Sequence, residues 1–164
     1  MELEEKVQTI MADVDSKSDM IERIVNEQVS LCCKELDNYI KWIHGILIDQ
    51  MPPSNQELDD IAMRLPATMY FTSDRQELMG VKEDIAEAVR KELYNNTYSD
   101  VDGTVADKTA QAELQVQSET IAKIIYSRAY KKVKQRMEVA MKLLDSIKKV
   151  ISHRMSDTEL TGRV

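Results

Sequence analysis

The stretch that decides the fold covers residues 106–155, ADKTAQAELQVQSETIAKIIYSRAYKKVKQRMEVAMKLLDSIKKVISHRM. It contains no proline and no glycine, and most of its residues favour helix. Fifty helical residues span about 75 Å, whereas a compact chain of this length has a radius of gyration of about 15 Å. Such a helix must bend, break or pack along a partner chain. A break near Glu119 and Thr120 is one alternative, and packing in a homo-oligomer is the interpretation we favour.

The composition of the whole chain also favours helices. The 164 residues include only 4 glycines and 3 prolines, and aromatic residues make up 5%. So few turn-forming residues argue against a β-sandwich or a glycine-rich nucleotide-binding fold. We therefore predict a single all-α domain, residues 1–164, with about five helices. Its parts would be an acidic front half (1–105), a long basic C-terminal helix (106–155) and a tail (156–164).

Helix boundaries in the front half follow from apolar spacing and helix breakers. Apolar residues at helical spacing predict a short helix over 3–14, followed by a polar break at 15–19 and a long helix over about 20–50. Pro52 and Pro53 should end that helix. Ser54 and Glu57 match a capping box and predict a new helix start.

Three further boundaries lie between this start and the basic segment. The helix that begins near Ser54 should stop before Pro66, because a residue preceding proline disfavours the helical conformation. We expect residues 67–73 to form a connector and residues 74–95 to form another helix. Residues 95–105 contain Asn, Asp and Gly and predict a loop.

Charge is segregated along the chain. The net charge is −9 over residues 1–62, −5 over 63–120 and +7 over 121–164, which sums to −7. A cationic segment suits a polyanion, because its side chains can neutralise phosphates. On a helical wheel, Lys131, Lys134, Lys142 and Lys149 lie opposite the apolar side, whereas Tyr126 and Tyr130 are expected to pack. Glu138 and Asp145 share the cationic face, so a solvated and partly self-paired surface remains an alternative.

The same segment carries an apolar stripe that we expect to form the oligomer interface. Its residues are Ile121, Ile125, Val133, Met137, Leu144, Ile147 and Ile151.

Catalytic and metal-binding patterns are weak. The string Asp100 to Thr104 resembles the nucleophile motif of haloacid-dehalogenase phosphatases, but no strand-like sequence precedes it and a helical stretch follows. The two histidines lack ligands at helical spacing, and the adjacent Cys32 and Cys33 form no disulfide framework. We therefore predict no enzymatic activity, no catalytic residue, no metal, no cofactor and no small-molecule substrate.

The segment from about Asp107 to Glu159 resembles bacteriophage recombination-mediator proteins of the UvsY-like family. The similarity rests on a long final helix that ends in the basic stretch Ser146-Ile147-Lys148-Lys149, with Arg154 beyond. The resemblance implies a small, helical, oligomeric protein that binds single-stranded DNA and helps to load a recombinase onto strands covered by single-strand-binding protein. The residues it would place at the DNA are Lys131, Lys132, Lys134, Arg136, Lys148 and Lys149.

These observations favour a non-enzymatic, phage-type recombination or replication accessory protein. Its partners would be single-stranded DNA, further copies of the chain and a recombinase or single-strand-binding protein. The alternative is a helical structural or assembly protein that binds another protein through its basic helix. No apolar run approaches the length of a membrane span, and the acidic N-terminus is no signal peptide, so we expect a cytoplasmic protein, in the host cytoplasm if phage-encoded.

Overall fold

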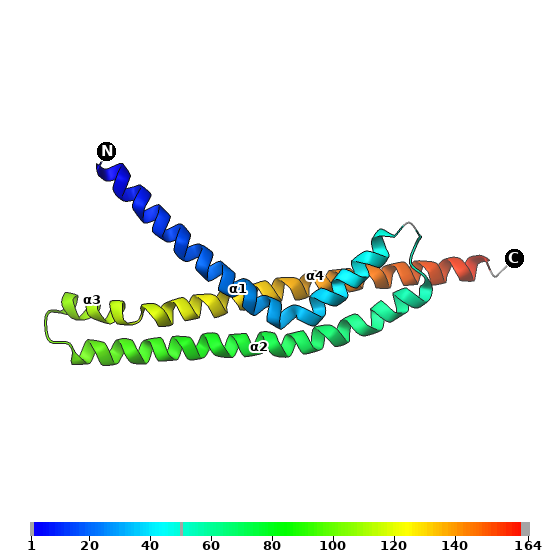
Figure 1. The fold of residues 1–164 in the computed structure, drawn as a ribbon. Coiled ribbons are helices and arrows are strands. Elements are labelled where there is room, and N and C mark those ends of the chain that lie inside the picture. Colours follow the sequence, from blue (N-terminus) through cyan, green and yellow to red (C-terminus); the bar gives the residue numbers. More distant parts are fainter. Residues whose placement is uncertain (1, 50, 162–164) are drawn as a thin grey trace. The chain divides into compact units, whose positions relative to one another are not determined.

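The chain is all-α in the computed structural model, which describes residues 2–49 and 51–161. These residues form four helices: α1 (Glu2–Ile48), α2 (Asn55–Asp100), α3 (Val105–Gln115) and α4 (Gln117–Thr161) (Figure 1). The described residues include no strand. The all-α class and the long C-terminal helix are therefore confirmed. The described residues form four helices rather than about five, because two predicted breaks do not occur and Val116 divides the C-terminal stretch into α3 and α4.

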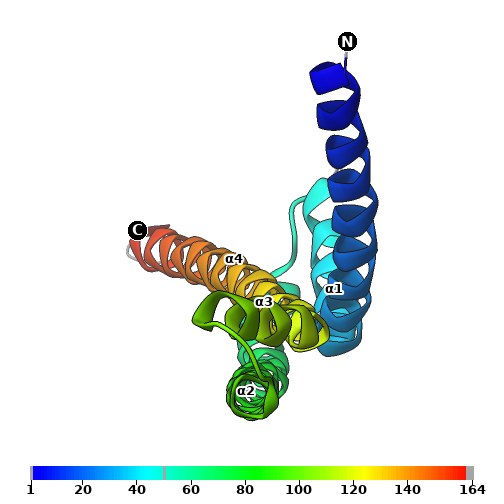
Figure 2. The ribbon, with the colours of Figure 1, turned by 90° about the vertical axis from the view of Figure 1, so that its left-hand side faces the viewer.

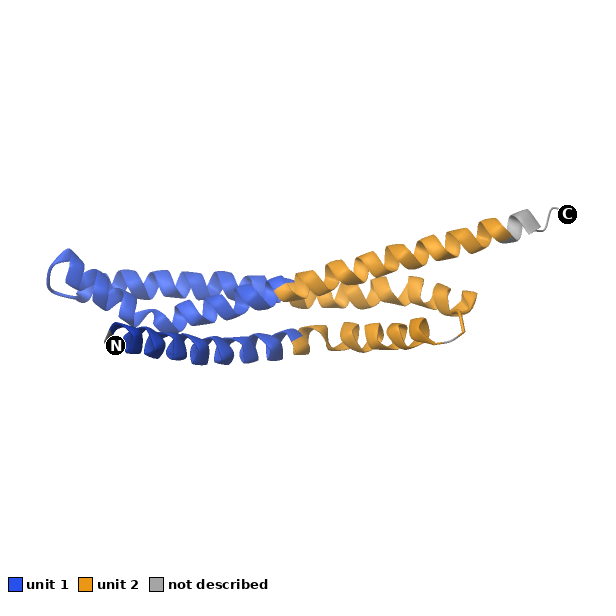
Figure 3. Cartoon of the chain, turned by 90° about the horizontal axis from the view of Figure 1, so that it is seen from above, with its two compact units in different colours: residues 1–29, 77–131 blue, residues 30–76, 132–164 orange. Residues whose placement is uncertain are grey.

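The chain forms two compact units, which Figure 3 shows in different colours. Unit 1 comprises Met1–Val29 and Glu77–Lys131, and unit 2 comprises Ser30–Gln76 and Lys132–Val164. Three of the helices, α1, α2 and α4, contribute residues to both units.

Unit 2 contains the main hydrophobic core of the chain, built where segments of α1, α2 and α4 pack together. The seven-residue step from Leu36 to Ile43 keeps both α1 side chains on one face of the helix. Burial of these side chains stabilises the unit by removing apolar surface from water. The buried residues are Leu36 and Ile43 of α1, Leu58, Ile61, Leu65 and Met69 of α2, and Ala140, Leu144 and Ile147 of α4.

The predicted helix end before Pro66 is wrong, and so is the connector at 67–73. Pro66 lies inside α2, where it is exposed to solvent. Leu65 and Met69 on either side of it are buried, with 0% and 6% of their surface exposed. The continuous helix places both side chains in the core of unit 2, and this packing offsets the cost of proline in a helix interior, which is about 3 kcal/mol relative to alanine.

The predicted boundaries around Pro52 and Ser54 are confirmed. Helix α1 ends at Ile48, and α2 begins with the capping box. The Glu57 carboxylate accepts hydrogen bonds from the Ser54 backbone N–H (2.7 Å) and hydroxyl (2.8 Å), and the Glu57 N–H donates to the Ser54 Oγ (3.2 Å). These bonds satisfy helix-end donors that would otherwise lack partners. The polar break predicted at 15–19 is absent, because α1 is continuous through it.

The loop predicted at 95–105 is much shorter, because α2 continues to Asp100 and α3 begins at Val105. Gly103 has a φ of 142°, a conformation suited to glycine, and Thr104 caps α3 through reciprocal hydrogen bonds with Asp107.

The stretch of residues 106–155 is not one helix, because Val116 separates α3 from α4. The alternative of a break near Glu119 and Thr120 is therefore confirmed, although the break lies at Val116, three residues before Glu119. Helix α4 continues to Thr161, so the predicted tail is helical at its start.

Unit 1 has a sparse core compared with unit 2. Its α3 and the beginning of α4 lie beside α2 (Figure 2). Three of the buried hydrophobic residues of unit 1 have small side chains: Ala112, Val116 and Ala129. In α1, all side chains from residue 3 to residue 20 are exposed.

Candidate nucleic-acid interface

The core of unit 2 fixes which face of α4 meets solvent. Ala140, Leu144 and Ile147 are buried against α1 and α2. Residues about half a turn away from them therefore face outward, and Lys142 and Lys149 are exposed there. These two lysines are seven residues apart, which places them about 10 Å from each other along one side of the helix.

The outward lysines of α4 are not neutralised by their neighbours. Glu138 and Asp145 share this face, but they form no ion pair with Lys134, Lys142 or Lys149. An exposed ammonium without a carboxylate partner can meet a phosphate without first breaking an ion pair. Of the six residues predicted at the DNA, four are exposed and record no ion pair: Lys131, Lys134, Lys148 and Lys149.

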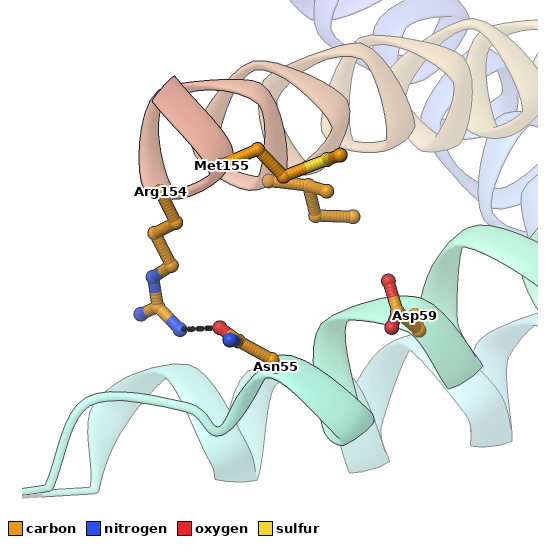
Figure 4. Close-up of a pocket in the computed structure, with 5 residues that line it drawn as sticks. Asn55, Asp59, Arg154 and Met155 are labelled. Atoms are coloured by element: carbon orange, nitrogen blue, oxygen red, sulfur yellow. Dashed lines mark hydrogen bonds between the residues drawn. The ribbon is translucent and has the colours of Figure 1, made fainter. Parts of the chain in front are cut away.

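Arg136, Lys132 and Arg154 differ from these lysines, because each interacts with other parts of the chain. Arg136 forms an ion pair with Asp37 of α1, and Lys132 is half-buried. Arg154 donates hydrogen bonds from Nη1 to the Pro53 carbonyl (2.7 Å) and to the Asn55 side chain (3.0 Å). These bonds attach α4 to the start of α2, at a small cleft that also includes Asp59 and Met155 (Figure 4). Arg154 therefore stabilises the packing of α4 against the start of α2.

Unit 1 carries a second group of cations that sequence reasoning missed. Arg90 of α2 and Lys123 and Arg128 of α4 line one pocket together with the hydroxyls of Thr120 and Ser127. Arg90 and Lys123 are two helices apart in sequence, so only the packing of α2 against α4 brings them together. No periodicity within α4 could have indicated the contribution of Arg90.

Glu87 organises this pocket. Its carboxylate pairs with Lys123 (3.0 Å), Arg90 (3.2 Å) and Lys91 (3.4 Å). Hydrogen bonds from Arg90 and Lys123 lower the pKa of Glu87 to about 2, so it is ionised at neutral pH. Arg90 uses its Nε for this contact. One carboxylate therefore balances only part of the positive charge, and Arg128 records no ion pair.

The two tyrosines of the basic segment lie in unit 1 and are half-buried. Lys82 of α2 lies over the Tyr126 ring, with its Nζ 5.5 Å from the ring centroid. The Tyr130 ring lies at Gly80, where an added Cβ would come within 3.5 Å of it. These contacts join α2 to α4, in agreement with the packing role we expected for both rings.

The residues predicted at the oligomer interface have partners within the chain. Val133, Leu144 and Ile147 are buried, and Met137 and Ile151 pack against the core of unit 2. Ile121 and Ile125 are half-buried in unit 1. The stripe thus explains how α4 packs in the monomer, and its role between copies stays a prediction.

The two thiols lie inside unit 2. Cys32 and Cys33 are both buried, and the Cys32 Sγ is 4.0 Å from the Thr72 carbonyl oxygen. The hydrogen bond between the two thiols lowers the pKa of Cys32 and, together with burial, raises the pKa of Cys33. Among the residues that the structure describes, no three His, Cys, Asp or Glu side chains gather as a metal site would require.

No protein family, curated protein or solved structure compared with this chain matches it. Within the described part of the chain, none of the helices combines the length and apolar character needed to cross a membrane.

Proposed function

We propose that the chain is a non-enzymatic recombination or replication accessory protein that binds single-stranded DNA through the outer face of α4. The observation that carries this proposal is the row of exposed lysines that record no ion pair, Lys134, Lys142 and Lys149 among them. The proposal includes assembly with further copies of the chain and contact with a recombinase or a single-strand-binding protein.

The local charge supports binding despite the acidic chain. Residues 132–157 contain seven Lys or Arg and three Asp or Glu, a net charge of +4. Salt screens charges over about 8 Å at physiological ionic strength, so a phosphate at this face responds mainly to the nearby lysines. Binding should weaken as salt rises, because each neutralised phosphate of a single strand contributes about −0.7 to the log–log slope.

The test is a titration of a fluorescent single-stranded oligonucleotide at several salt concentrations. Replacing Lys142 and Lys149 together with Gln should reduce the magnitude of the slope of log binding constant against log salt concentration by about 1.4, because two phosphate contacts are lost. The matched control exchanges Lys34→Gln and Lys41→Gln, which are also exposed, seven residues apart on one helix and without a recorded ion pair. The control should bind as the parent does. A parent that fails to bind at low salt, or equal losses in both variants, would refute the proposal.

One observation favours the alternative, a helical assembly protein whose basic helix binds another protein. The ion pair between Arg136 and Asp37 shows that the basic segment can bind carboxylates of the acidic front half. A partner with an exposed acidic surface would use the same chemistry. The alternative predicts that the Lys142 and Lys149 variant loses binding to such a protein. In the DNA titration, either this variant keeps the signal of the parent or the parent itself gives no signal.

A further inference from the structure

The pocket of unit 1 is lined by three cations, and none of its described lining residues is acidic. Arg90 comes from α2, whereas Lys123 and Arg128 come from α4. The hydroxyl-bearing residues Thr120 and Ser127 complete its polar lining. Its volume of about 350 Å³ admits a small ligand. A cavity lined by cations and hydroxyl groups is suited to an anion that accepts several hydrogen bonds.

One side of α4 supplies most of this lining. Thr120, Lys123 and Ser127 follow one another in steps of three and four residues, which keeps their side chains on one side of the helix. Arg90 joins them from α2. The ion pair between Glu87 and Lys123, with a distance of 3.0 Å, connects the two helices at the pocket. The folded unit therefore holds these groups together before any ligand arrives.

Glu87 uses only part of the hydrogen-bonding capacity of these cations. It accepts from the Nε of Arg90 at 3.2 Å, and no partner is recorded for either Nη of Arg90. The hydrogen bond with Glu87 and, more weakly, the charge of Glu113 raise the pKa of Arg90, so its guanidinium stays charged. An arginine held through Nε keeps outer N–H groups whose geometry matches a phosphate. The Lys123 ammonium carries three donors and records one acceptor, a Glu87 oxygen.

Two further donors of the pocket have no recorded partner. Arg128 is exposed and records neither an ion pair nor a hydrogen bond. The Ser127 hydroxyl likewise records no hydrogen bond. The Thr120 hydroxyl differs, because it donates to a backbone carbonyl of the preceding turn at 2.8 Å. An anion in the pocket can therefore accept from Arg128 and Ser127 without breaking an existing contact.

We propose that this pocket binds a phosphate group, with Arg90, Lys123 and Arg128 as its charged contacts and the Ser127 hydroxyl as a further donor. A phosphate group presents at least three strong acceptor oxygens and so matches donors that approach from two helices. The group can belong to a small phosphorylated molecule or to a nucleic-acid strand. The site shares no residue with the row of lysines that carries the proposed function, and the two proposals are tested separately.

Phosphorus NMR of inorganic phosphate tests the site, because exchange with the slowly tumbling protein broadens the phosphate resonance. The titration keeps the ionic strength constant with sodium chloride, so that screening does not change. The parent should bind. Arg128→Gln should weaken binding about tenfold, as expected for the loss of a charge-assisted hydrogen bond. Because Arg128 is exposed and records no partner, this variant should keep its helix content, which circular dichroism checks.

The matched control is Arg23→Gln, which removes an exposed arginine of unit 1 that lies on α1 and records no ion pair. This control should bind phosphate as the parent does. Equal weakening in the two variants would show that phosphate responds to the general charge of the surface, which overturns the proposal. A parent that leaves the phosphate resonance unchanged overturns it as well.

Competition then identifies the source of the phosphate group. A nucleoside monophosphate and a single-stranded oligonucleotide are added separately to the protein with inorganic phosphate bound. Displacement by the monophosphate alone supports a small phosphorylated ligand, and displacement by the oligonucleotide supports a nucleic-acid strand. If neither displaces inorganic phosphate, the pocket holds an adventitious ion only and the proposal is wrong. Inorganic phosphate is the probe throughout, so a failure of DNA binding at the lysines does not change this readout.

Discussion

The two halves of α1 have the same apolar periodicity and opposite environments. In the second half, Leu36 and Ile43 are buried in the core of unit 2, with 1% and 0% of their surface exposed. In the first half, Val7 and Val14 recur at the same seven-residue step and remain exposed. Periodicity therefore identifies a helix and its apolar face. Val7 lies ten helical turns before Ile43 and so on the same side of α1, so whether this face is buried depends on which other helices reach it.

The largest effect that tests this comparison comes from one substitution made in each half. Ile43→Ala should lower the free energy of unfolding by about 2–5 kcal/mol, because it leaves a cavity in the core of unit 2. Ile10→Ala should change it by less than about 0.5 kcal/mol, because the side chain is 63% exposed. Urea unfolding followed by circular dichroism, at a protein concentration low enough to avoid assembly, measures both. Similar losses in the two variants would contradict the distinction.

A second test concerns how strongly the core of unit 2 determines local structure. Pro66→Ala should stabilise the protein by about 1–3 kcal/mol, since α2 is helical at this exposed position and proline is the poorest helix former. The same urea experiment measures the gain. Thr68→Ala is a control nearby in α2, without a proline effect. A destabilised Pro66→Ala variant would indicate that α2 is interrupted here, as the sequence alone suggested.

The differences between prediction and structure have a common physical cause. Local signals were reliable where the interaction is local, as in the capping box at Ser54 and Glu57 or the helix end at Ile48. They failed at Pro66, where the burial of Leu65 and Met69 outweighs the local preference, and at residues 15–19, where α1 is continuous although the side chains are exposed. The outward lysines of α4 followed from the wheel, because Leu144 and Ile147 fix its inner face. The pocket formed by Arg90 and Lys123 could not be predicted, because it depends on the pairing of α2 with α4.

A smaller effect is expected at the helix start that the sequence identified correctly. Ser54→Ala removes the hydroxyl that accepts from the Glu57 N–H and should cost about 1 kcal/mol. Ser54→Asp retains an acceptor and should restore most of the loss. Thermal unfolding of the two variants beside the parent measures the difference. If Ser54→Ala melts with the parent, the cap does not contribute to the stability of unit 2.

The smallest effect distinguishes the two units by their response to acid. Unit 2 is held by an apolar core, whereas in unit 1 Glu87 joins α2 to α4 through its ion pair with Lys123. Hydrogen bonds from Arg90 and Lys123 lower the pKa of Glu87 from 4.5 to about 2 in the folded chain. A depressed pKa stabilises the fold above the unfolded value, and this contribution is lost as the pH falls from about 4.5 to about 2. Glu87→Gln should therefore unfold at a lower temperature than the parent at pH 7, and the difference should disappear by pH 2.

The control is Glu138→Gln, which removes a carboxylate with no recorded ion pair and should melt as the parent does at every pH. A gap between Glu87→Gln and the parent that stays constant down to pH 2 would show that the ion pairs of Glu87 are not its cause.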